Sequence, residues 1–222
     1  MKPKVPCVAF SGVCDFMRLL GFLEKFEREK AALPVRFFSV DLLRALWLLR
    51  AGRTSRIAIA KGLGVGEGSA RTIIAFLLEE GLVGISQEGV ALSKKGAAVL
   101  GEFERAVCAS DFSEAALSFG KPGFLVRIRA LGKLAGNGQA QRDSAVKMGA
   151  DGATVFFAQG GRLLLPFDSA GKNFFGAKTV ESVVRACGPL EDGDVFTLAF
   201  GLDACGVQRG AWSVAATLLK SK

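Results

Sequence analysis

The spacing of apolar residues changes near residue 110, and this change constrains the fold more than any other feature of the 222-residue chain. Before it, apolar side chains recur every three or four residues, which predicts amphipathic helices. After it, segments such as Phe124–Arg129 set Phe, Val and Ile in alternation with Leu and Arg, which predicts a strand. We therefore expect a helical N-terminal half and a C-terminal half built on a β-sheet.

The N-terminal half is expected to hold five helices and one hairpin. Ser39 and Ser93 are predicted N-caps, because a serine hydroxyl accepts a hydrogen bond from the free N–H groups of a first turn. The helix after Ser39 is apolar on nearly all sides, so we expect it either at the centre of its domain or against a partner. The helices are expected over residues 15–31, 39–50, 55–62, 67–80 and 94–108, and the hairpin strands over 82–86 and 89–92.

This order of elements is typical of a winged helix-turn-helix domain, in which the third helix protrudes and the hairpin forms the wing. The segment TSRIAIAKGLGVGEGSARTIIAFLLEEGLVGIS, followed by ALSKKG, resembles the turn, recognition helix and first wing strand of such a domain. The resemblance extends over about residues 36–108 and implies contact with duplex DNA.

Beyond residue 123 the pattern predicts the order β-α-β-β-α-β-α. This order favours a two-layer α/β domain, a mainly antiparallel sheet with helices on one face, so the fold class is α+β. The strands are expected over residues 124–129, 153–158, 162–165 and 194–201, and the helices over 139–148, 179–186 and 207–219. The expected domains are an N-terminal extension (1–35), a winged helix-turn-helix domain (36–110), a linker (111–123) and a two-layer α/β domain for ligand sensing or dimerisation (124–222).

The two halves together resemble a family of uncharacterised archaeal proteins. The segments GNGQAQRDSAVKMGADGATVFF and GRLLLP carry this resemblance in the C-terminal half. Members join an N-terminal winged helix to an α/β domain likened to the GAD insert of some tRNA-charging enzymes. The resemblance covers most of residues 36–219 and implies transcriptional regulation.

The charge of the chain favours a polyanionic partner. Lys and Arg number 29 against 21 Asp and Glu, which gives a formal net charge of +8. The stretch from Arg36 to Arg71 is especially basic. We therefore expect double-stranded DNA as the partner, and an RNA-associated or protein-docking adaptor without catalytic activity is the alternative.

The residues expected to contact DNA lie on the recognition helix and on its flanks. Arg71 suits a guanine or a phosphate, and the serine and threonine beside it can hydrogen-bond to either. The acidic hairpin tip, Gln87-Glu88, argues against insertion of the wing into the minor groove. The alternative is a solvated surface used for protein contact. The predicted DNA-binding residues are Arg53, Arg56, Gly68, Ser69, Arg71, Thr72 and Lys94.

A second candidate site follows the first strand of the C-terminal half. There a glycine-rich segment opens a helix, so free backbone N–H groups and the helix dipole are expected to face a small anionic effector. The alternative is a plain connection capped by Asn137, with Arg142 paired to a carboxylate. The predicted ligand-binding residues are Gly136, Gly138, Gln139, Arg142 and Arg127.

The chain contains no histidine, which excludes Ser-His-Asp triads, Cys-His dyads and His-ligated metal sites. Its five cysteines are widely spaced and include no CxxC motif, so reduced thiols, a cytoplasmic location and no zinc site are expected. No signal peptide or membrane span is predicted. We expect no enzyme, no catalytic residues and no cofactor, and we expect a homodimer whose contacts include Leu19 and Leu23.

Overall fold

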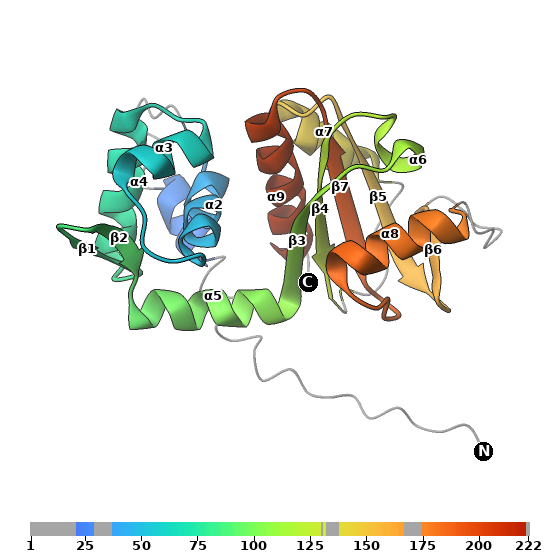
Figure 1. The fold of residues 1–222 in the computed structure, drawn as a ribbon, viewed down its shortest axis with the longest axis horizontal. Coiled ribbons are helices and arrows are strands. Elements are labelled where there is room, and N and C mark those ends of the chain that lie inside the picture. Colours follow the sequence, from blue (N-terminus) through green and yellow to red (C-terminus); the bar gives the residue numbers. More distant parts are fainter. Residues whose placement is uncertain (1–20, 29–36, 130, 132–137, 167–174, 221–222) are drawn as a thin grey trace, which may run out of the picture.

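The computed structural model describes residues 21–28, 37–129, 131, 138–166 and 175–220, and shows an α+β protein with a five-stranded antiparallel sheet (Figure 1). The described residues of the N-terminal unit, 21–28 and 37–106, form helices and one hairpin. After a helical segment over residues 21–28, its elements are α2 (Val40–Leu49), α3 (Arg56–Leu63), α4 (Glu67–Glu79), β1 (Val83–Ser86), β2 (Gly89–Leu92) and α5 (Lys94–Ala106). The predicted order is confirmed over this range.

The C-terminal unit, residues 107–220, contains the sheet in the order β3-β4-β7-β5-β6, with every neighbouring pair antiparallel. Its elements are β3 (Val107–Phe112), α6 (Ala115–Ser118), β4 (Gly123–Ile128), α7 (Gln139–Lys147), β5 (Gly152–Gln159), β6 (Arg162–Leu164), α8 (Ala177–Cys187), β7 (Val195–Phe200) and α9 (Ala204–Lys220). The predicted β-α-β-β-α-β-α order is confirmed from β4 onward.

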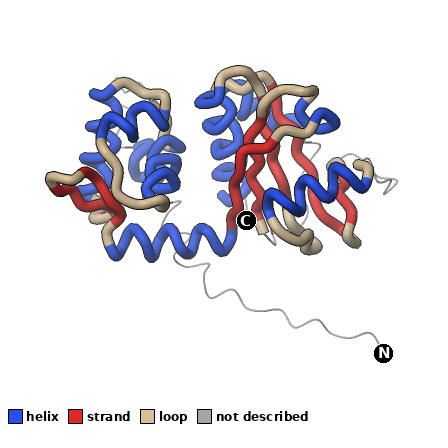
Figure 2. The backbone as a smooth tube through the Cα atoms, viewed as in Figure 1, coloured by secondary structure: helices blue, strands red, loops and turns tan. Residues whose placement is uncertain are grey.

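The segment expected to be a linker, residues 111–123, is instead part of the C-terminal unit. It holds the end of edge strand β3 and the short helix α6, and Phe112 and Leu117 are buried there. Helix α5 runs into β3 without an intervening loop, as Figure 2 shows. The serine, glycine and proline content of the segment favoured a loop, but two buried apolar side chains anchor it.

Helices cover both faces of the sheet, so the predicted arrangement with helices on one face is wrong. Helices α7 and α9 pack on one face through residues such as Ala145 and Trp212, and α8 packs on the other through Val183. The physical reason lies in the central strand β7, whose six residues are all buried. A strand buried on both sides needs cover on both sides.

Serine capping is confirmed at one of the two predicted positions. The Ser93 hydroxyl accepts a hydrogen bond from the Gly96 N–H at 2.9 Å. Ser39 does not cap α2, because its own backbone is helical and its hydroxyl donates to Glu27 Oε1 at 2.6 Å. The Asp41 carboxylate takes over the capping role by accepting from the Phe38 N–H at 3.1 Å.

Helix α2 lies between the two units, which explains its nearly continuous apolar surface. Leu42, Leu46 and Leu49 are buried, and α2 contacts α3, α4 and α5 on one side and α9 on the other. The Trp47 and Trp212 rings meet edge to face, with centroids 5.1 Å apart. The apolar core therefore runs from one unit into the other.

A buried charge cluster joins α2, the end of α3, and α9. The Asp41 carboxylate accepts from Arg44 Nη1 at 2.6 Å and from Arg209 Nε at 3.0 and 3.1 Å. Both guanidiniums also donate to the Leu63 carbonyl oxygen at 3.0 Å, at the C-terminal end of α3. Two guanidiniums and one carboxylate leave the cluster with one positive charge in excess, and the negative end of the α3 dipole stabilises that charge. Because both arginines bind the Leu63 carbonyl oxygen, they also cap the C-terminal end of α3.

We predict that Asp41→Asn destabilises the protein by about 3–5 kcal/mol, because it leaves two largely buried guanidiniums without a carboxylate. Denaturant unfolding measures the change. The matched control is Lys121→Ala, which removes the exposed ion pair with Asp151 and is expected to cost about 0–1 kcal/mol. Equal effects of the two substitutions would contradict the role assigned to the cluster.

Two glycines of α5 provide a second test of packing. A Cβ on Gly96 would lie 1.9 Å from the Leu82 carbonyl oxygen, whereas a Cβ on Gly101 would meet nothing within 4 Å. We expect Gly96→Ala to destabilise by about 2 kcal/mol, since backbone has to move. Gly101→Ala is expected to stabilise by about 0.5–1 kcal/mol, because alanine favours a helix. Thermal melts of both variants decide whether α5 and Leu82 are in close contact.

Candidate nucleic-acid interface and ligand cavities

Helix α4 buries one face and exposes the other near its N-terminus. Ala70, Ile73 and Leu77 are buried against the core. The opposite face begins at the glycine turn after α3 and carries small, hydroxyl and basic side chains. Its exposed or half-buried members are Gly68, Ser69, Arg71, Thr72 and Ala75.

Two helices of the N-terminal unit carry basic side chains at ends where the helix dipole favours acidic ones. Arg56 begins α3 and Lys94 begins α5, and neither first turn contains an acidic residue. Both side chains are exposed and form no ion pair with any described residue. Such an arrangement lowers helix stability and favours an external anion near these ends.

The start of α3 lies against the hairpin. Thr54 exchanges two backbone hydrogen bonds with Val90 of β2, each 2.9 Å long. Helix α5 follows β2 directly, after Ser93. The basic starts of α3 and α5 therefore flank the same small hairpin.

Arg53, predicted to contact phosphate, is held by the hairpin tip instead of standing free. Its guanidinium pairs with Glu88 Oε2 at 2.9 Å and donates to the Ser86 hydroxyl. The acidic tip thus has a partner within the chain. The sequence showed both charges but not that they meet.

The predicted ligand segment forms one wall of a cavity of about 610 Å³ beside β5. Gly138, Gln139 and Arg142 line it together with Asp151 and Pro166. Gly138 precedes α7 with φ +81°, a conformation that suits glycine. Gly136 and Asn137 lie outside the described residues. An anionic effector here stays a prediction.

Arg127 does not reach that cavity, which corrects its assignment as a ligand-binding residue. It is 1% exposed and pairs with the equally buried Asp194 at 2.5 Å. Its Nη1 also donates to the Cys187 carbonyl oxygen at 2.7 Å. The alternation of β4 placed its side chain beneath α8, on the face that the sequence analysis left uncovered.

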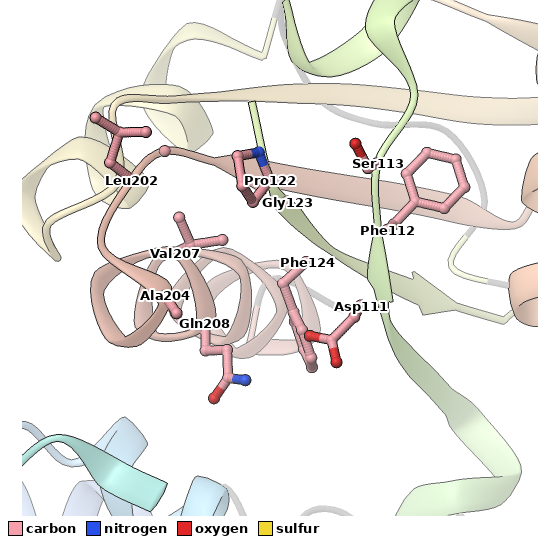
Figure 3. Close-up of a pocket in the computed structure, with 11 residues that line it drawn as sticks. Asp111, Phe112, Ser113, Pro122, Gly123, Phe124, Leu202, Ala204, Val207 and Gln208 are labelled. Carbon is pink, nitrogen blue, oxygen red and sulfur yellow. The ribbon is translucent and has the colours of Figure 1, made fainter. Parts of the chain in front are cut away.

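Two further cavities adjoin each other, the first within the C-terminal unit and the second where the N-terminal unit meets it. The first, of about 480 Å³, lies over β3, β4 and the start of α9 (Figure 3). The second, of about 340 Å³, extends from the end of α2 to β3. Asp111, Phe124 and Gln208 line both. The sequence does not reveal these cavities, because their walls come from segments far apart in the chain.

Cys108 on β3 interacts with Cys187 at the end of α8. The hydrogen bond from the Cys187 thiol lowers the pKa of Cys108 to about 6, with further help from Arg127, Arg129 and Arg50 against the opposing effect of burial. The same hydrogen bond and burial raise the pKa of Cys187. The lowered pKa favours the thiolate form of Cys108. The wide spacing of the cysteines in the sequence did not reveal that Cys108 and Cys187 meet.

Within the described residues, no cluster of three or more Cys, Asp or Glu side chains could hold a metal ion. Over the same residues, no helix is both long enough and apolar enough to span a bilayer.

Comparison with known proteins supports the fold. Residues 119–218 match the model of a family described as a domain of unknown function, DUF4443. A solved structure of a hypothetical protein from Pyrococcus horikoshii OT3 is similar, with a TM-score of 0.70 and 23% identity. The match covers 84% of this chain and 95% of that one. No curated protein matches. At this identity, the likeness establishes a fold shared with an archaeal protein.

We predict that iodoacetamide alkylates Cys108 with a pH midpoint near 6. The thiolate is the nucleophile, so the rate falls about tenfold per pH unit below the midpoint and levels off above it. Cys187→Ala removes the donor and moves the midpoint up, toward the ordinary thiol value of about 8.5. Peptide mapping by mass spectrometry assigns the rate to Cys108. A midpoint unchanged by Cys187→Ala would contradict the hydrogen bond.

Proposed function

We propose that the protein is a DNA-binding transcriptional regulator whose N-terminal unit is a winged helix-turn-helix domain. In this proposal α4 is the recognition helix and β1-β2 the wing, and α4 enters the major groove by its N-terminal end. The observation that carries the proposal is the exposed face of α4 together with the exposed basic side chains of Arg56 and Lys94, which form no ion pair with any described residue.

Each contact has a defined role. Arg71, exposed in the second turn of α4, suits a guanine or a phosphate, and Ser69 and Thr72 beside it suit hydrogen bonds to either. Gly68 allows the DNA backbone to approach closely. Arg56 and Lys94 suit phosphates, because they lie at helix ends that attract anions. Arg53 is neutralised by Glu88 and contributes little.

A homodimer remains part of the proposal, since specific sites usually come from two-fold dimers. Its interface is not the one expected from the sequence. Leu23 is 2% exposed within the core of the N-terminal unit, and α2 is covered by α9. Leu19 lies outside the described residues.

One observation favours the alternative of protein docking. Ile57 on α3 is 67% exposed and Ile85 on β1 is 53% exposed, although both belong to the unit assigned to DNA. An adaptor that uses these side chains would bind no duplex, and its partner binding would not depend on Arg71.

We predict that the full chain binds duplex DNA with a salt slope of about −2.7, from three phosphate contacts at about −0.9 each for Arg56, Arg71 and Lys94. Removing any one of the three side chains should flatten the slope by about 0.9. Glu88→Gln releases Arg53, so it should tighten binding and steepen the slope to about −3.6.

The matched control for Glu88→Gln is Glu79→Gln, which removes an exposed carboxylate at the far end of α4. Fluorescence anisotropy over a range of salt concentrations measures all variants. Absence of duplex binding would overturn the proposal, as would binding that Arg71→Ala leaves unchanged.

A further inference from the structure

The cavity of about 340 Å³ between the two units carries an inference that goes beyond DNA binding. Its walls come from α2 and the turn after it on one side, and from β3, β4 and α9 on the other. Protein ligand sites occur preferentially in such positions, and pockets of roughly 300–1,000 Å³ hold small molecules.

Two opposite charges line this cavity without pairing to each other. The Arg50 guanidinium stacks on the Trp47 ring, 3.8 Å from its centroid, and forms no ion pair with a described residue. The Asp111 side chain, at the exposed end of β3, likewise has no charged partner among the described residues. A cation and an anion held apart on one cavity complement a ligand that carries both charges.

A buried donor in the cavity wall is also unsatisfied. Arg44 is 2% exposed and lines the cavity, and its Nε has no hydrogen-bond acceptor within the described residues. Its other two nitrogens are occupied, and Nη2 donates to Gln208 Oε1 at 3.0 Å. The Nε is enclosed by protein atoms, so a ligand oxygen does not reach it in this structure, and Arg44 contributes its positive charge to the cavity wall. Arg44 and Arg50 both lie on α2 and together suit a carboxylate.

Apart from Ser110, the remaining lining side chains are apolar, and three of them are aromatic. Trp47, Trp212 and Phe124 face the cavity of about 340 Å³, and Phe124 continues into the adjoining one of about 480 Å³. Figure 3 shows Phe124 between Asp111 and Gln208, with Val207 and Pro122 farther along the adjoining cavity. An apolar side chain of a ligand would lie along this path.

We propose that the cavity between α2, β3 and α9 binds a zwitterionic α-amino acid with an apolar side chain. Its carboxylate contacts Arg50 and lies near the positive charge of Arg44, its ammonium contacts Asp111 and the Gln208 amide oxygen, and its side chain packs on Phe124. The ligand touches both units at once. This site does not depend on the proposed DNA binding, and its test uses no DNA.

The test compares three amino acids with their blocked forms by isothermal titration calorimetry of the full chain. L-leucine, L-methionine and L-phenylalanine are the probes. We expect at least one of the three amino acids to bind. Its N-acetyl form lacks the ammonium and its amide form lacks the carboxylate, so each should bind at least about tenfold more weakly. Absence of binding by all three, or equal binding of a blocked form, would overturn the proposal.

Two variants locate the site. Arg50→Gln and Asp111→Asn each remove one lining charge and should weaken binding at least about tenfold. The matched controls, Arg185→Gln on α8 and Asp143→Asn on α7, remove exposed charges that do not line the cavity and should leave affinity unchanged. Because all four side chains are at the surface, folding is expected to survive, which circular dichroism checks. Retained affinity in both lining variants would place the ligand elsewhere.

Discussion

The contact between α2 and α9 is the interaction on which the rest of this structure depends. One carboxylate, from Asp41, neutralises two guanidiniums that also bind the carbonyl end of α3. Buried charges of this kind add little to stability over an apolar contact, but they tolerate few alternative geometries. The cluster therefore sets the position of α3, and through the short glycine turn also that of α4, relative to the sheet.

The sequence predicted local structure well, because its signals are local. Apolar periodicity, the Ser93 cap and the glycines with positive φ, such as Gly81 and Gly160, lie within the elements that they define. Helix boundaries consequently differ from expectation by only a few residues. The order of the sheet could be predicted only in outline, since strand pairing depends on residues far apart.

The wrong predictions for Arg127 and for residues 111–123 share one physical cause, which is burial by a distant segment. Arg127 is basic and lies beside the glycine-rich segment in sequence, but α8 covers it and Asp194 neutralises it. The end of edge strand β3 carries the polar residues Ser110 and Asp111, but pairing with β4 holds it in the sheet. Of the candidate sites, the exposed face of α4 was predictable from helical spacing. The cavity between Arg50 and Asp111 was not, because no pattern joins those positions.

The unbroken passage from α5 into β3 has a consequence for how such a chain can evolve. Small helical domains in many proteins are exchangeable modules, joined to other domains through linkers that recombination can cut. Here a cut after Ala106 would remove α9 from α2 and expose Trp47 together with the Asp41 cluster. Neither unit can be replaced by an unrelated domain unless the contact surface between α2 and α9 also changes. The two units are expected to be inherited, lost and modified as one piece.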